Sequence, residues 1–377
     1  MKTALSQIRQ VLQTRQLICP LLGTLLAIGS WAAQAQSNKF EPPINPYLAD
    51  SPWPMSHRNP YNQASSPLPG PEDGQRLEVS FQEQEFPSIT LTYGNPYGNG
   101  RRAVYGSTAT TMYKLDMNPP GIDNVHRLRK SDVTANGETG AYVVADRNNY
   151  LYVPKGKILE KYRDKPDAGI PPQQQELEKA AEFILPDNLL KSSEEYIIGI
   201  NLTYDGYLVL ATNLGLIALL SRDFSKLYPY RLGEEETISN SLAVDEEGGI
   251  YVVTSRYMHR LAFDGNQITS RWRADYEHGP DIPWPGRLGI GSGSTPTLMG
   301  TGGDQDKFVV FTDGQELTHL VLMWRDKIPD NWTPIAPGKD IRIAAEIPVT
   351  FGNNSATRSI SEQSVLVSGY GAIVVNN

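Results

Sequence analysis

The sequence predicts an all-β protein, a β-propeller of six or seven four-stranded blades, from three observations. A short phrase recurs in which a turn of Asp, Asn and Gly precedes four or five apolar β-formers. The copies recur every 43 to 58 residues, close to the ~40–50 residues of a propeller blade. A four-stranded blade cannot bury both its faces alone, so repeated blades must pack on one another around a ring. Counted at their first strand residue, the copies begin at Val104, Tyr150, Tyr207, Ile250, Phe308 and Val365.

The first 35 residues have the features of a secretory signal peptide. Lys2, Arg9 and Arg15 precede an apolar stretch over residues 17–28, and Ala33-Gln34-Ala35 forms a cleavage site. The alternative is a membrane anchor, but the apolar stretch is interrupted by Pro20 and is shorter than the ~20 residues that a span needs. We therefore expect export to the periplasm or the extracellular space, with no membrane span in the mature chain.

Charge and cysteine usage exclude several function classes. The chain has 34 Lys and Arg against 42 Asp and Glu, and the leader holds three of the basic residues and no acidic one. The mature chain is left with 31 basic residues against 42, a net charge of about −11, so neither nucleic acid nor an anionic membrane is an expected partner. Cys19 lies in the leader, so the mature chain has no disulfide and no thiolate site.

Residues 36–76 are rich in Pro, Asn, Ser and Gly, which predicts an extended arm on the surface of the body. Within it, the apolar group at Trp53-Pro54-Met55 is expected to plug a hydrophobic slot. The propeller is assigned to residues 77–377. One insertion, over residues 173–183, lacks Gly, Pro and β-branched residues and predicts a short helix.

The chain stops directly after a strand, at residues 371–377. Either an N-terminal strand completes the last blade, or the chain is a fragment truncated at its C-terminus. The sequence leaves both alternatives open.

Two short phrases resemble known propeller families. Residues 238–253, Ile-Ser-Asn-Ser-Leu-Ala-Val-Asp followed by Gly-Ile-Tyr-Val-Val, resemble the repeat of gluconolactonase and strictosidine-synthase-like propellers. Residues 292–298 and the arm's Trp-Pro-Met segment resemble quinoprotein-like propellers that use pyrroloquinoline quinone (PQQ). The docking Trp with Thr-Gly and the adjacent cysteine pair of quinone-dependent members are absent, so PQQ is not an expected cofactor.

The gluconolactonase resemblance implies a divalent cation, such as calcium, in the central channel. In that family the Asn of the phrase is a metal ligand, which corresponds to Asn240, and Asn201 holds a similar position one repeat earlier. Calcium needs six to eight oxygens, usually including carboxylates. Inner-strand ends point to the channel, so Asn201, Asn240, Ser294 and Ser359 are candidates to converge. The alternative is that these residues cap inner strands and bond neighbouring blades.

Four further residues are candidates for ligand binding. His278 lies in a loop with acidic and aromatic neighbours, and Arg358 and Glu362 lie in a polar segment between two strong strands. Glu138 is a further carboxylate. A rigid surface loop, and a solvated loop with a salt bridge, are the alternatives for these segments.

The sequence thus predicts an exported, quinoprotein-like propeller that binds a small-molecule or protein ligand at the mouth of its channel. A calcium-dependent hydrolase of the lactonase kind is the alternative. Whether the chain catalyses a reaction is left open.

Overall fold

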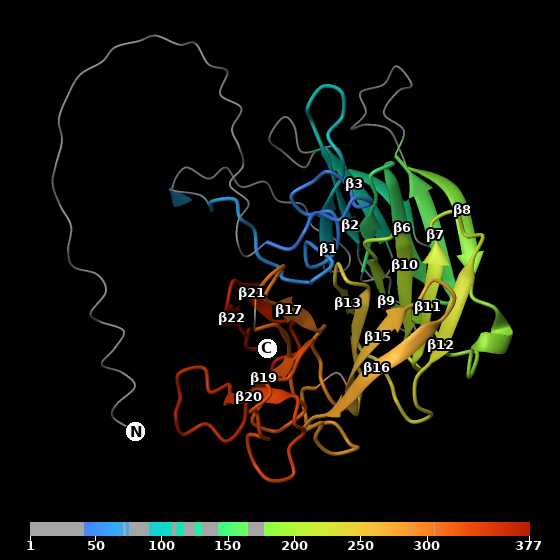
Figure 1. Cartoon of the computed structure of the whole chain (residues 1–377). Helices are drawn as coiled ribbons and strands as arrows, with labels where there is room; N and C mark the ends of the chain where they lie inside the picture. Colours follow the sequence, from blue (N-terminus) through green and yellow to red (C-terminus); the bar gives the residue numbers. More distant parts are fainter. Residues whose placement is uncertain are drawn as a thin grey trace, which may run out of the picture. The chain divides into compact units, whose positions relative to one another are not determined.

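The strands form a series of antiparallel sheets that follow one another in chain order (Figure 1). The computed structural model describes residues 41–70, 73–74, 90–107, 111–116, 125–129, 142–164, 177–287, 289–304 and 306–377. All of them belong to one unit, Asn38–Asn377. In these ranges the sole helical element is a 3₁₀ turn, η3 (Asp187–Leu189).

Each sheet is an up-and-down meander of consecutive strands. The first contains β1 (Thr90–Tyr93), β2 (Ala103–Ser107), β3 (Thr111–Asp116) and β4 (Val125–Arg129). The second contains β5 (Val144–Ala145), β6 (Tyr150–Lys155), β7 (Ile158–Arg163) and β8 (Glu178–Ile184). The third contains β9 (Ile197–Leu202), β10 (Tyr207–Thr212), β11 (Leu216–Ser221) and β12 (Leu227–Arg231).

The remaining sheets repeat the pattern. The fourth contains β13 (Ala243–Val244), β14 (Gly249–Val253), β15 (Tyr257–Phe263) and β16 (Ile268–Asp275). The fifth contains β17 (Thr297–Met299), β18 (Phe308–Thr312), β19 (His319–Trp324) and β20 (Ile343–Pro348). The sixth described sheet has two strands, β21 (Leu366–Ser368) and β22 (Gly371–Ile373).

One layer of buried apolar side chains lies between each pair of successive sheets. For example, Val144 and Tyr152 of the second sheet pack with Ile200 and Leu210 of the third. Equivalent layers join the other neighbours. Alternate residues of each strand face opposite neighbours, so a sheet in this position is apolar on both faces. Meandering four-stranded sheets stacked in this way define a β-propeller, which confirms the predicted fold class.

The described part of the proline-rich arm lies on the surface only in part: residues 66–70 are exposed as predicted, whereas residues 54–56 and 59–63 are buried. Residues 53–65, here called the axial segment, run along the first strands of the sheets, and Met55, Tyr61 and Asn62 are at most 1% exposed. Carbonyl groups of the axial segment accept backbone N–H bonds from five first strands: Trp53 from Tyr93, Pro54 from Ala145, Pro60 from Val244, Tyr61 from Leu298 and Gln63 from Val367. In the third sheet, the Asn201 side chain donates to Pro60 instead.

The surface position predicted for the arm is wrong for the axial segment, because a proline has no backbone N–H donor but keeps its carbonyl acceptor. A first strand has one unpaired edge whose N–H groups need partners, and a Pro-rich segment can supply carbonyls to it. Positive φ angles at His57, Arg58, Asn62 and Ala64 turn the chain between successive partners. The predicted anchoring by Met55 is confirmed, since that side chain lies in the core between the second and third sheets.

The helix predicted over residues 173–183 is wrong where the structure describes it. Residues 178–184 form the outer strand β8, which pairs with β7 from Ile158–Ile184 to Arg163–Glu178. Its side chains are mostly exposed. Backbone pairing with β7 therefore overrides the helical preference of Glu, Lys and Ala at these positions.

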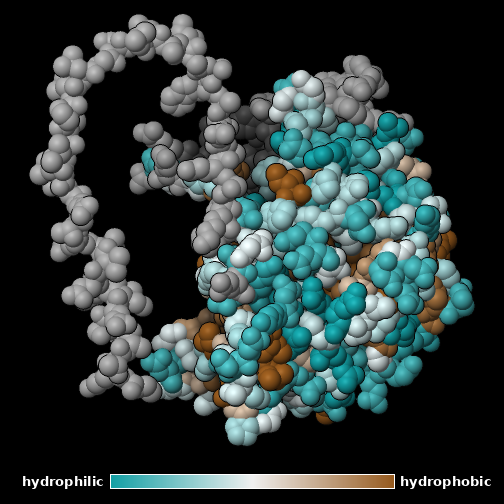
Figure 2. Space-filling model, viewed as in Figure 1, coloured by the Kyte–Doolittle hydropathy of each residue, from teal (hydrophilic) through white to brown (hydrophobic). Residues whose placement is uncertain are grey.

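The face of the molecule seen in Figure 2 is mainly hydrophilic, with small separate hydrophobic patches. Among the described residues, no helix has the length and apolar character that crossing a bilayer would require.

Candidate functional site

Hydrogen-bonding side chains from four sheets meet at the starts of the first strands. Tyr142 precedes β5, Asn240 precedes β13, Thr295 precedes β17 and Ser364 precedes β21. His57 of the axial segment completes this group, which we call the axial cluster. Of these five, sequence analysis identified Asn240 alone as a candidate site residue. Thr295 lies in the phrase at residues 292–298, which indicated a propeller family and not a site.

Short contacts link the members of the axial cluster. The Tyr142 hydroxyl donates to Asn240 Oδ1 at 3.2 Å and lies 3.3 Å from Thr295 Oγ1. Ser364 Oγ accepts the Thr295 N–H bond at 3.0 Å and lies 3.4 Å from His57 Nε2. The His57 and Tyr142 rings lie 5.8 Å apart at 47°. Residues up to 307 positions apart in the chain are thus joined through side chains.

The axial cluster carries no net charge at neutral pH. Burial lowers the pKa of His57 to about 4 and raises the pKa of Tyr142. Both rings nevertheless keep part of their surface accessible, as do Asn240 and Ser364. The cluster therefore offers neutral hydroxyl, amide and imidazole groups, which can donate and accept hydrogen bonds.

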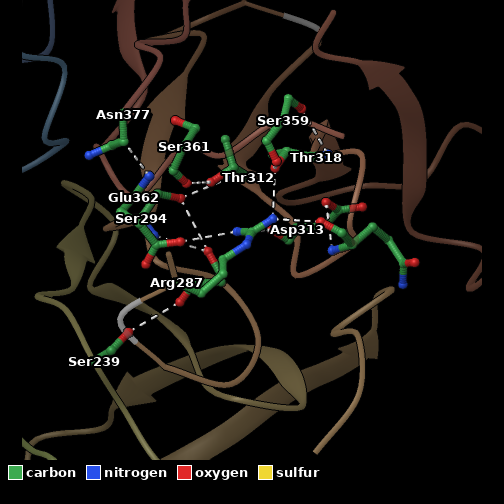
Figure 3. A network of polar contacts seen from close by, with 12 residues as sticks. Ser239, Arg287, Ser294, Thr312, Asp313, Thr318, Ser359, Ser361, Glu362 and Asn377 are labelled. Atoms are coloured by element: carbon green, nitrogen blue, oxygen red, sulfur yellow. Dashed lines mark hydrogen bonds and ion pairs between the residues drawn. The ribbon is translucent and has the colours of Figure 1, made fainter. Parts of the chain in front are cut away.

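A second network lies beside the cluster, reached through residues 292–295 (Figure 3). Ser239 donates to Ser292 O at 3.1 Å, and Ser294 Oγ accepts from Thr312 N at 2.9 Å. A side chain at Gly293 would displace the Glu362 carboxylate. The segment before the first strand of the fifth sheet thus connects the axial cluster to Glu362.

Glu362 pairs with a residue that sequence analysis did not identify, Arg287. Arg287 Nη1 lies 3.2 Å from Glu362 Oε1, and the side chains are 2% and 3% exposed. Arg287 Nη2 also donates to Gln315 O at 2.6 Å and to Thr318 Oγ1 at 2.7 Å (Figure 3). Buried charges need this degree of hydrogen bonding to be tolerated. Arg287 Nε and Ser361 Oγ remain buried without a partner in the described part of the chain.

Among the described residues, neither Arg358 nor His278 bonds to Arg287 or Glu362. Arg358 is exposed and donates to Pro285 O. His278 stands edge-on to Tyr276 at 6.4 Å, and its Nδ1 is buried without a partner among the described residues. Glu138 lies outside the described residues.

The two predicted metal ligands occupy different settings. Asn201 is fully buried, and its amide donates to Pro60 O and Leu242 O while its oxygen accepts from Leu202 N. Asn240 is half-buried in the axial cluster. Ser294 and Ser359 bond the backbone N–H groups of Thr312 and Thr318. Over the described ranges, no three His, Cys, Asp or Glu side chains are grouped as metal ligands.

The chain is similar to proteins of several kinds. No family model matches it. An uncharacterized protein of Archaeoglobus fulgidus is 43% identical over 349 residues, and the chain spans 64% of that relative's length, using 89% of its own.

Three solved structures share features of the fold. The β-propeller domain of Myceliophteria thermophila Cps50 (Swd1) has a TM-score of 0.42 and 10% sequence identity, and the match covers 71% of this chain and 72% of that one. A streptogramin B lyase has a TM-score of 0.38 and 12% identity, with 64% of this chain and 67% of the lyase covered. The extracellular domain of BT4673 of B. thetaiotaomicron has a TM-score of 0.42 and 15% identity, with 73% of this chain and 30% of that one covered.

Proposed function

We propose that this protein is an exported propeller that binds a small, neutral, polyhydroxylated ligand at the axial cluster. One observation carries the proposal: neutral hydrogen-bonding groups from four sheets and the axial segment meet at partly accessible positions. A saccharide presents hydroxyl groups that both donate and accept, together with apolar faces that pack on aromatic rings. Tyr142, His57 and Asn240 offer this combination.

Export rests on the leader sequence of residues 1–35. Cleavage after Ala35 would leave Gln36 as the first residue of the mature protein. Expression of the full chain in a bacterial host, followed by N-terminal sequencing of the protein from the periplasm and the medium, tests this step. Recovery of the intact chain from the cytoplasm alone would contradict it.

The ligand proposal is tested by titrating a set of neutral mono- and disaccharides into the full chain by calorimetry. Tyr142→Phe removes the hydroxyl that reaches Asn240 and Thr295, so we expect binding to weaken about 10-fold, the effect of one lost polar contact. Asn240→Ala should act similarly. Tyr228→Phe, on the outer strand β12, is the matched control and should bind as the original chain does. No saccharide binding, or equal binding by Tyr142→Phe, would overturn the proposal.

A further inference from the structure

Three interfaces between successive sheets carry the same polar pair. A Tyr on the second strand of one sheet lies opposite a cation on its third strand: Tyr105 with Lys114, Tyr152 with Lys161, and Tyr251 with Arg260. At the other two interfaces the equivalent positions are apolar, Val209 with Leu219 and Val310 with Leu322. In the four of these sheets whose first strand donates a backbone N–H to the axial segment, the second-strand residue has the same register relative to that donor.

In two of the polar interfaces, the next sheet supplies a carboxylate to the cation. Lys114 Nζ lies 2.6 Å from Asp164 Oδ1, and Arg260 Nη2 lies 3.5 Å from Asp326 Oδ1. Asp164 directly follows the third strand of the second sheet, and Arg222 holds the same place after β11 in the third sheet, whereas Asp326 stands one residue further on, after Arg325. Between the second and third sheets, a cation thus stands where the interface between the first and second sheets has an anion.

Lys161 is left without a carboxylate partner. Its Nζ donates to Arg222 O at 2.7 Å and lies 4.1 Å from the centroid of the Tyr150 ring. Within the described ranges, no carboxylate oxygen comes within ion-pair distance, 4.0 Å, of this nitrogen. An ammonium group has three N–H donors, so two donors of Lys161 remain for a ligand.

Arg222 is held in place by three contacts. Its Nη1 lies 3.2 Å from Asp146 Oδ2, its Nε donates to Gly206 O at 3.2 Å, and its guanidinium lies 4.6 Å from the centroid of the Tyr47 ring. Its Nη2 makes no hydrogen bond to the described residues. The position of this cation is therefore fixed before any ligand binds.

Lys161 and Arg222 line a cavity of about 330 Å³ between the second and third sheets, together with Tyr150, Tyr152, Asp146 and Asp223. The Asp146 oxygens accept bonds from the backbone of Asn148 and Tyr150, from Tyr152 and from Arg222. The Asp223 carboxylate bonds Ser221 and Ser225 of its own turn. Both carboxylates are therefore engaged away from Lys161.

We propose that this cavity binds the carboxylate group of a small organic acid. The ligand supplies to Lys161 the carboxylate that Asp164 supplies to Lys114 between the first and second sheets, bridging Lys161 Nζ and Arg222 Nη2. With Asp146 and Asp223 nearby, a singly charged carboxylate suits the site better than a doubly charged phosphate. The Tyr150 ring offers an apolar face to the remainder of the acid. This site is separate from the axial cluster and does not depend on the function proposed there.

Calorimetric titration of the full chain with acetate, benzoate and inorganic phosphate tests the proposal. We expect benzoate to bind more tightly than acetate, and both more tightly than phosphate. Lys161→Met keeps the apolar stem and removes the charge, and should weaken benzoate binding about tenfold or more because a charge-assisted bond is lost. Arg260→Met, at the interface that already has its aspartate, is the matched control and should leave benzoate binding unchanged.

A second variant guards against misfolding. Arg222→Asp introduces the carboxylate that Asp164 supplies between the first and second sheets, and should abolish benzoate binding while the chain keeps a cooperative thermal transition. A peptide with a free C-terminus, compared with its amide, distinguishes a peptide carboxylate from a free acid as the source. The proposal is overturned if benzoate and the free peptide both fail to bind, if Lys161→Met binds as tightly as the original chain, or if phosphate binds more tightly than either carboxylate.

Discussion

The interface between the first and second sheets and the one between the second and third start from the same pattern but differ in one residue. Both place a Tyr opposite a Lys on adjacent strands. In the first, Asp164 accepts from Lys114, Tyr97 and Tyr105, and the lysine is fully buried. In the second, Arg222 replaces the aspartate, and Lys161 is half-exposed at a cavity. A polar site whose partners are all in the chain can be buried, whereas one that lacks a partner stays open.

The same distinction separates the two asparagines of the predicted metal site. Asn201 makes all its bonds within the chain and is fully buried. Asn240 stands half-buried among groups of the axial cluster. Closed polar sites of this kind are expected to contribute to stability, and open ones to ligand binding.

Breaking the closed interface should have the largest effect. Asp164→Ala removes the carboxylate that pairs with the fully buried Lys114, which costs about 3–5 kcal/mol in the free energy of unfolding. Urea denaturation of the full chain measures this. Asp264→Ala is the matched control, because Asp264 also follows a third strand but caps its own turn at an apolar interface. Asp264 is exposed, so its loss should be clearly the smaller one, and equal losses in the two variants would contradict the comparison.

Asn201→Ala should have the next largest effect, through stability and not through a metal. It removes the amide that bonds Pro60 O, Leu242 O and Leu202 N, at a cost of roughly 1–3 kcal/mol. We expect the same loss with calcium and with a chelator. The measurement is thermal unfolding of the full chain and of this variant in both conditions, with Asn240→Ala in parallel.

A calcium-dependent rise in the unfolding temperature that disappears in Asn201→Ala and Asn240→Ala would instead support the predicted calcium site, by mass action on the folded state. The expectation that Asn201→Ala loses the same stability with calcium and with a chelator would then be wrong. A calcium-dependent hydrolase would become a stronger hypothesis than a saccharide-binding propeller.

The sequence predicted what local patterns determine. Tyr150, Tyr207 and Phe308 begin the second strands of their sheets, and the copies at Val104 and Ile250 are one residue into theirs. These positions follow from Asp and Gly turns, where the side chain bonds the backbone a few residues on. Asp245, for example, accepts from Gly249 N at 2.6 Å.

The last copy of the repeat was assigned to the wrong strand. Val365 directly precedes a first strand, β21, whose Val367 N–H reaches the axial segment like its counterparts in other sheets. The second strand of this sheet is β22, with the less apolar sequence Gly-Ala-Ile. Apolar content alone cannot distinguish a first strand from a second, because both are buried on two faces.

The partners of Glu362 and of the axial segment could not be predicted, for a different reason. The Arg287–Glu362 pair spans 75 positions and the His57–Ser364 contact spans 307. Such contacts are fixed by the packing of sheets and leave no periodic signal in the sequence. The many prolines of the arm indicated that it lacks N–H donors for pairing in a β-sheet. Its backbone carbonyls can still accept hydrogen bonds, and the composition does not show this because every residue has one.

The pair formed by the partly exposed His319 and the buried Asp313 should give the smallest effect, and one that depends on pH. The hydrogen bond from His319 Nδ1 to Asp313 Oδ2, at 2.8 Å, raises the pKa of His319 above its ordinary value of 6.5, outweighing the opposite effect of burial. A raised histidine pKa adds stability that is fully present below pH 6.5 and is lost as pH rises through the folded pKa. His319→Gln should therefore cost more at pH 5.5 than at pH 9, by under about 1 kcal/mol because solvent screens the pair. Urea denaturation at both pH values measures the difference.

His57→Gln is the contrasting variant. Burial lowers the pKa of His57 to about 4, so the stability cost of His57→Gln should have the opposite pH dependence. A cost for His319→Gln that is equal at the two pH values, or greater at pH 9, would show that the pair of His319 and Asp313 is not ionised in the folded protein.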